Sequence, residues 1–194
     1  MRVLYWIVGT VMMALFVHII TIFWVPTMSA NQAFAVLNRI GAQGGLVMLP
    51  EPQTVPTDDD LSTEAIPYRD PYITTATCRF DLARGPLVLR GRIASPYWSF
   101  TIHRENGAYH YGLTQSAIRE GRIHIELRNA AQVRARILDP DAPITDAIQV
   151  EMPFNSGLIL VKSLSTVESE REAVRTAMEG TTCRYLPTQA APGS

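Results

Sequence analysis

The sequence lacks the short motifs that identify the common enzyme classes. It contains no G-x-S-x-G nucleophile turn, no phosphate-binding P-loop, no Rossmann glycine pattern and no H-E-x-x-H zinc motif. Hydrolase, nucleotide-dependent and metalloprotease activities therefore have no support. Four aspartates lie beside predicted turns, where carboxylates usually accept hydrogen bonds from backbone N–H groups: Asp81, Asp139, Asp141 and Asp146. No paired general acid and base can be assigned among them. The sequence favours a protein without enzymatic activity and predicts no cofactor.

An excess of charge of one sign is also missing. The chain has 17 basic and 18 acidic residues, a formal net charge of −1, and no basic cluster along the sequence. Nucleic-acid-binding domains normally carry a basic patch, so nucleic acid is not expected as a partner. A length of 194 residues leaves room for one domain of ordinary size and a membrane segment.

Cysteine is scarce, with only Cys78 and Cys183 in the chain. Two thiols alone cannot form a structural zinc site, and neither belongs to a C-x-x-C redox motif. The two residues bracket the predicted β domain, and a disulfide between them is predicted if the domain is exported. Two buried free thiols are the alternative, which applies if the domain faces the cytosol.

Formal charge is absent from Val3 to Val25, which is long enough to cross a hydrocarbon core of roughly 30 Å. Aromatic residues near both ends of this run suit the headgroup level of a bilayer. We therefore predict a transmembrane anchor over 1–30. A cleaved signal peptide is the alternative, with Met28-Ser29-Ala30 as a small-residue site, but the run is longer than a normal signal core.

Arg2 and the amino terminus precede this run, and the next basic residue is Arg39, which places the N-terminus on the cytoplasmic side and the following domain in the periplasm. His18 lies within the run. An intramembrane histidine can act as a proton relay or heme ligand. The alternative is a neutral ring that faces a partner helix or bonds a backbone carbonyl.

The chain between the anchor and the β domain is predicted to be a short helix over Asn31–Ile40 followed by an extended, proline-rich linker that ends at residue 71. Asp58-Asp59-Asp60 in this linker suggests either a calcium site or solvated charge, and the glycine and distal glutamate of a calcium loop are missing. The predicted β domain covers 72–186, and a disordered tail covers 187–194.

Apolar residues alternate with polar ones after Tyr72, which predicts an antiparallel β-sandwich or jelly-roll-like domain. The predicted strands are Thr74–Phe80, Leu87–Ile93, Tyr97–His103, Tyr109–Thr114, Arg122–Arg128, Val133–Leu138, Ala147–Met152 and Gly157–Lys162. One C-terminal helix should follow. Ser165 and Glu168 form a capping-box pattern at its start, and Gly180 is placed to end it.

Asn106-Gly107 predicts a hairpin with a two-residue type I′ turn, which would set His103 directly opposite His110. The two imidazoles would then be close enough to share a transition metal, with His124 as a third candidate ligand. The alternative is two exposed imidazoles side by side. Trp98 on the other face of the hairpin is either a sugar-stacking platform or, as its predicted face favours, a core residue.

Four short segments carry a resemblance to a known family: Asp70-Pro71, Cys78-Arg79-Phe80-Asp81-Leu82, Gly85-Pro86 and Tyr97-Trp98-Ser99. From about Pro67 to Cys183 the chain resembles the DUF1254 domain family, particularly its short membrane-anchored bacterial members. In longer relatives a DUF1214 domain follows in the same chain. The resemblance therefore implies a β-rich domain at a bacterial inner membrane, with a separately encoded DUF1214-type membrane protein as a partner. It implies no catalytic residues.

Two functions follow as hypotheses. The first is a periplasmic accessory or interaction protein of the bacterial envelope, anchored in the bilayer and paired with another membrane protein. The alternative is a domain that binds or acts on a small ligand or glycan through the face of His103 and His110.

Overall fold

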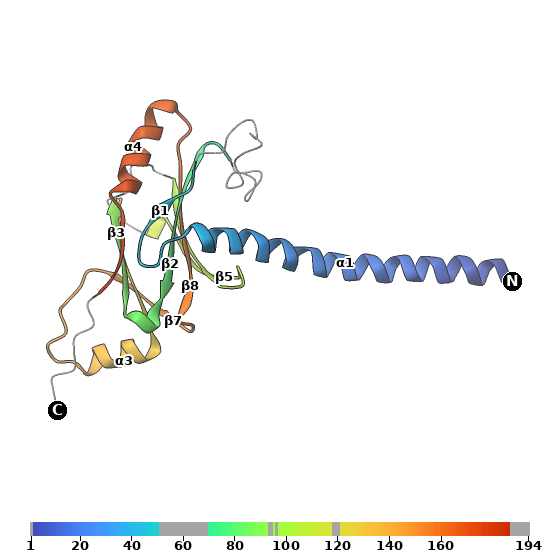
Figure 1. The fold of residues 1–194 in the computed structure, drawn as a ribbon, viewed down its shortest axis with the longest axis horizontal. Helices are drawn as coiled ribbons and strands as arrows, with labels where there is room; N and C mark the ends of the chain where they lie inside the picture. Colours follow the sequence, from blue (N-terminus) through green and yellow to red (C-terminus); the bar gives the residue numbers. More distant parts are fainter. Residues whose placement is uncertain (1, 51–69, 93–94, 96, 118–120, 187–194) are drawn as a thin grey trace.

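In a computed structural model of the chain, the described residues are 2–50, 70–92, 95, 97–117 and 121–186, without the side chains of 26–34 (Figure 1). The predicted tail and most of the proline-rich linker, with Asp58-Asp59-Asp60, lie outside this part. A mainly β domain follows an N-terminal apolar helix, and this confirms the predicted fold class.

The helix α1 spans Arg2–Ile40 and is continuous over its 39 residues. Its first part, Arg2–Val25, is long and apolar enough to cross a membrane, and none of it is buried against the other residues that the structure describes. The short helix predicted at Asn31–Ile40 is the end of this same helix. Figure 1 shows α1 projecting from the side of the β domain, so the apolar surface of Arg2–Val25 is not covered by the described part of that domain.

Two facing sheets form the domain. The five-stranded sheet has the order β1-β2-β8-β4-β5, and the four-stranded sheet has the order β7-β6-β3-β9. Their bounds are β1 Val47–Met48, β2 Ile73–Asp81, β3 Leu87–Arg92, β4 Trp98–Arg104, β5 Tyr109–Thr114, β6 Arg122–Asn129, β7 Ile148–Met152, β8 Ser156–Leu164 and β9 Thr182–Tyr185. All pairs are antiparallel except β6 and β7. Seven of the eight predicted strands are present.

The core lies between the sheets because alternate residues of each strand point inward. Phe80, Phe100 and Ile102 of the first sheet and Leu89 and Ile125 of the second are almost completely buried. Trp98 is 5% exposed and belongs to the same core, as its predicted face indicated.

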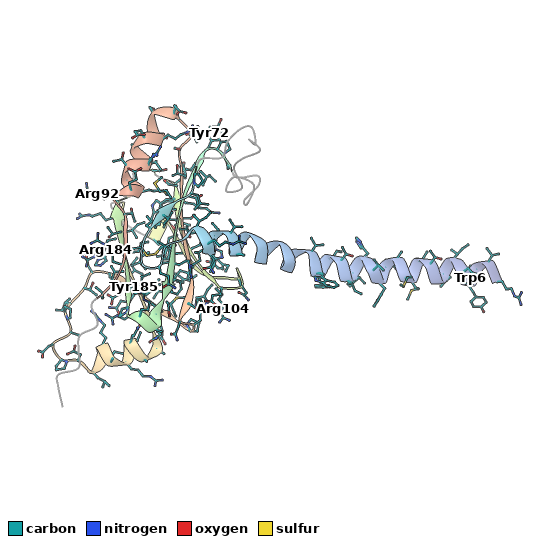
Figure 2. All side chains as sticks on the ribbon, in the orientation of Figure 1. Trp6, Tyr72, Arg92, Arg104, Arg184 and Tyr185 are labelled. Carbon is teal, nitrogen blue, oxygen red and sulfur yellow. A yellow bond between two sulfur atoms is a disulfide. The ribbon has the colours of Figure 1, made fainter. Side chains whose placement is uncertain are left out.

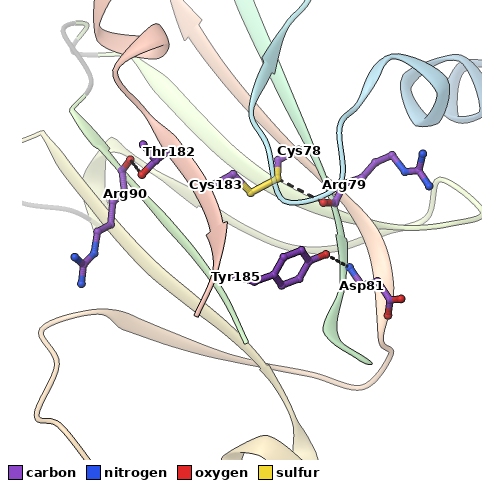
Figure 3. Close-up of a disulfide and its surroundings, with 7 residues drawn as sticks. All are labelled: Cys78, Arg79, Asp81, Arg90, Thr182, Cys183 and Tyr185. Atoms are coloured by element: carbon purple, nitrogen blue, oxygen red, sulfur yellow. Dashed lines mark hydrogen bonds between the residues drawn. A yellow bond between two sulfur atoms is a disulfide. The ribbon is translucent and has the colours of Figure 1, made fainter. Parts of the chain in front are cut away.

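The predicted disulfide is confirmed and joins the two sheets through the core (Figure 3). Cys78 lies on β2 and Cys183 on β9, both are buried, and their Cα atoms are 6.6 Å apart. The bridge closes a separation of 105 residues. Disulfides persist in oxidising compartments, so this one indicates that the domain lies in such a compartment.

The strand predicted at Val133–Leu138 is wrong, because this segment is the helix α3, Ala130–Leu138. Asn129 caps it: its side chain accepts the Gln132 N–H, and the Gln132 side chain accepts the Asn129 N–H. The strand after α3, β7, runs parallel to β6. Parallel neighbours need a crossover connection, and α3 supplies it.

The helix α4, Glu168–Glu179, is present as predicted, but the predicted capping box of Ser165 and Glu168 is wrong. Val167 is the N-cap and makes no side-chain hydrogen bond. Ser165 is buried instead, and its hydroxyl donates to the carbonyl of Tyr72. Gly180 ends the helix, and β9 follows almost at once.

The segment after α1 belongs to the β domain, because β1 pairs with β2 before the proline-rich segment begins. Leu37 packs against Leu158 and Leu160 on the outer face of the five-stranded sheet. The Arg79 guanidinium donates to the carbonyl of Asn38 at 2.8 Å. The apolar helix is therefore attached directly to the sheet, and the residues of the predicted linker connect two strands of that sheet.

Candidate functional site

The β4–β5 hairpin has a three-residue turn in place of the predicted two-residue turn. The Gly107 N–H donates to the Arg104 carbonyl at 2.9 Å, and the Arg104 N–H donates to the Ala108 carbonyl at 2.9 Å. Gly107 has φ 79°, a conformation that favours glycine. An Asn-Gly pair suits this turn as well as the type I′ turn, so the two residues alone do not fix the pairing.

The longer turn changes the register. Ile102 lies opposite Tyr111 and His103 opposite Tyr109, which leaves His110 as a bulge in β5. The predicted pairing of His103 with His110 is therefore wrong. A one-residue shift in a strand moves a side chain to the other face, and the two imidazoles consequently have separate surroundings.

His103 uses both ring nitrogens within the hairpin. Its Nδ1 lies 3.1 Å from the Gly107 carbonyl oxygen, and its Nε2 lies 3.1 Å from Thr101 Oγ1. A carbonyl oxygen can only accept, so in the neutral ring Nδ1 carries the proton and Nε2 accepts from the hydroxyl. Neither nitrogen has a free lone pair for a metal in this arrangement.

His110 belongs to an aromatic cluster at the edge of the sandwich. Its ring meets the Phe154 ring edge-on, with centroids 5.0 Å apart. The Arg104 guanidinium lies 4.8 Å from the centroid of Phe154, and Phe80 stacks against Phe154. Cation–π and edge-to-face contacts of this kind stabilise packing, so the structure gives His110 a packing role.

His124 lies on the other sheet, on the outer face of β6. Its Nδ1 is 2.6 Å from Asp146 Oδ1, and its Nε2 accepts from Arg90 Nε at 2.8 Å. The hydrogen bond from His124 lowers the pKa of Asp146. Among the described residues, no three His, Cys, Asp or Glu side chains are grouped so that they could hold a metal.

The four-stranded sheet carries a basic surface that is not evident from the sequence, because its residues are far apart along the chain. The outer face of this sheet carries five arginines from three strands: Arg90 and Arg92 from β3, Arg122 and Arg128 from β6, and Arg184 from β9. Three carboxylates lie on or beside the same face, those of Glu126, Asp146 and Glu151. We call this surface the arginine face. Arg92 and Arg122 lie directly opposite each other. In Figure 2, Arg92 and Arg184 lie on the side of the domain away from α1.

His18 lies on one side of α1 that carries small and hydroxyl-bearing residues beside larger apolar ones. Gly9, Thr10, Ala14 and Thr21 share this side with Trp6, Met13 and Val17. The two threonine hydroxyls donate to carbonyls of their own helix, those of Trp6 and Val17. Such a side allows close approach of a second helix in a membrane.

No protein-family model and no curated protein matches the chain. Among solved structures, the chain is similar to the VPA0106 protein from Vibrio parahaemolyticus, with 8% identity, a TM-score of 0.52, and coverage of 85% of this chain and 40% of that one. It also aligns with an uncharacterised protein from Burkholderia cenocepacia, with 14% identity, a TM-score of 0.46, and coverage of 85% and 43%. The chain thus spans less than half the length of either protein, and the first likeness shows a shared fold alone.

Proposed function

We propose that the chain is a membrane-anchored accessory protein of the bacterial envelope, whose β-sandwich lies in the periplasm and pairs with another membrane protein. The observation that carries this proposal is the attachment of an exposed apolar helix to a disulfide-bonded domain. A helix of this composition is stable in a bilayer, and the disulfide needs the oxidising side of that bilayer. The charge around the helix favours an inner-membrane protein with its N-terminus in the cytoplasm.

The proposed partner is a DUF1214-type or other envelope membrane protein. Two surfaces support an interaction. The arginine face carries more arginines than carboxylates and would meet an acidic surface of a partner. The side of α1 that carries His18 would meet a partner helix. In VPA0106 the shared fold occupies 40% of a longer chain, so there it occurs together with further protein.

Affinity capture tests this proposal. The full chain with a C-terminal tag would be captured from native membranes in mild detergent, and co-purifying proteins would be identified by mass spectrometry. We expect the tagged chain to recover one membrane protein repeatedly. When that membrane protein carries the tag instead, it should recover this chain. Repeated recovery of the chain alone would contradict the proposal.

Reversing two charges of the arginine face tests whether this face binds the captured partner. Arg92→Glu with Arg184→Glu changes the arginine face, whereas Arg134→Glu changes an exposed arginine on α3 outside it. We expect the double variant to recover at least about tenfold less partner and the Arg134 variant to match the wild type. Equal recovery by all three would exclude the arginine face as the binding surface.

A further inference from the structure

A cavity of about 460 Å³ lies at the end of the sandwich beside α3. Its walls come from four parts of the chain: the turn after β2, the end of β6, α3 with the loop after it, and the residue that follows β9. Its lining includes Arg84, Arg128, Ala135, Arg136, Asp139 and Leu186. This size is within the range of small-molecule sites.

Hydrogen bonds hold the walls in place. Gln132 Nε2 donates to the Leu82 carbonyl at 2.6 Å, which fixes α3 against the turn after β2. The Leu186 N–H donates to the Pro86 carbonyl at 2.8 Å. Arg136 Nη2 donates to the Pro143 carbonyl at 2.7 Å, which fixes the loop after α3. The cavity is therefore formed before any ligand arrives.

The charge of the cavity is positive. The guanidinium groups of Arg84, Arg128 and Arg136 line it, while Glu126 lies behind two of them with 3% of its side chain exposed. Arg128 Nε donates to Glu126 Oε1, and Arg136 Nη1 lies 3.9 Å from the same oxygen. The carboxylates of Glu126 and Asp139 oppose the three guanidinium groups, which leaves one net positive charge at the cavity.

Each guanidinium has five N–H donors, and each of the three donates one hydrogen bond within the described part of the chain, which leaves donors for a ligand. Arg84 is held by Gln43 at 2.6 Å and by the face of the Tyr185 ring. Fixed guanidinium forks match the two oxygens of a carboxylate or phosphate. The rest of the lining is mainly apolar, from alanine, proline and leucine side chains.

We propose that this cavity binds a small organic anion, with a carboxylate or phosphate group on the arginines and an apolar body against α3 and Leu186. This site is separate from the histidines that the sequence indicated, which lie on β4, β5 and the outer side of β6. It gives the domain a ligand in addition to its proposed partner, and it does not depend on that partner.

Equilibrium dialysis with naphthyl probes tests the proposal. The full chain would be held in phosphatidylcholine nanodiscs, with empty nanodiscs as the blank. The probes are 2-naphthoate, 1-naphthyl phosphate, 2-naphthylmethanol and 2-naphthylmethylamine, together with inorganic phosphate. We expect saturable binding of the two naphthyl anions, and binding about tenfold weaker or less for the alcohol, the amine and inorganic phosphate.

Three variants locate the binding. Arg84→Gln removes an exposed guanidinium that does not contact Glu126, and Ala135→Phe fills the cavity from an exposed helix position. Arg134→Gln is the control, because it makes the same charge change as Arg84→Gln outside the lining. We expect the first two to weaken naphthoate binding about tenfold or more and the control to leave it unchanged.

Several outcomes would overturn the proposal. These are no saturable binding of either naphthyl anion, equal binding of the alcohol, inorganic phosphate binding as tightly as naphthyl phosphate, or unchanged binding by both cavity variants. Retention of the Cys78–Cys183 disulfide and an unchanged proteolysis pattern would show that each variant is folded.

Discussion

The contact with His124 changes the acidity of Asp146, so the stability that this pair contributes should depend on pH. The hydrogen bond to His124 lowers the pKa of this exposed carboxylate. A carboxylate with a lowered pKa in the folded state stabilises the fold above about pH 4, and the effect disappears as the pH falls through the folded-state pKa. We expect Asp146→Asn to lower the melting temperature slightly at pH 7, with a difference that shrinks below about pH 4. A difference that stays constant from pH 7 to pH 3 would contradict this role.

Gly157 occupies a position where no side chain fits. A Cβ atom there would lie against the His103 carbonyl oxygen and 2.8 Å from the Phe80 ring. Because both neighbours are held in the sandwich, we expect Gly157→Ala to destabilise the domain by about 1–3 kcal/mol in urea-dependent proteolysis. Gly180→Ala is the control, since its nearest contact would be 3.5 Å away and its φ is −73°. Equal stability of the two variants would show that β8 can move to accept the methyl group.

At the scale of elements, α3 depends on its N-cap. Asn129 accepts the Gln132 N–H at 2.9 Å and also donates to Asn155. We expect Asn129→Ala to cost about 0.5–2 kcal/mol and to speed hydrogen exchange of α3 amides more than that of the strands. Arg134→Ala in the same helix should change little, because its side chain is exposed. Uniform acceleration over the whole domain would indicate that α3 unfolds only with the sandwich.

The disulfide joins the two sheets, so its removal should affect both. In the chain-entropy model, a closed loop of 105 residues contributes about 4–5 kcal/mol. We expect Cys78→Ala with Cys183→Ala to lose stability of this order in urea-dependent proteolysis. Loss of protection confined to β9 would show instead that the bridge only fastens the last strand.

Period-two alternation predicted the strands well, because both sheets bury one face each. It failed at Val133–Leu138, where valine, alanine and isoleucine alternate with arginine and leucine in a way that suits a strand as well as a helix. It also missed β9, which has only four residues directly after α4. The turn chemistry of Asn106-Gly107 was compatible with two turn lengths, and the shorter one gave a histidine pair that the register does not contain.

At the scale of the whole molecule, the surfaces of interest are products of topology. The arginine face collects residues from Arg90 to Arg184, and the cavity collects residues from Ala83 to Leu186. No local pattern in the sequence brings these residues together, because sheet order and the β6–α3–β7 crossover decide which strands are neighbours. The apolar N-terminal helix and the disulfide, by contrast, depend on one apolar run and two cysteines, and these could be predicted from the sequence.

The proposed function requires an uncleaved membrane helix that carries the β domain on the oxidising side of a membrane. Intact-mass measurement of the chain from membranes isolated under native conditions, alkylated with and without prior reduction, tests both parts of this requirement. We predict the mass of a chain that retains α1, with no alkyl groups before reduction and two after it. Two alkyl groups without reductant, or a mass that lacks the N-terminal helix, would contradict it.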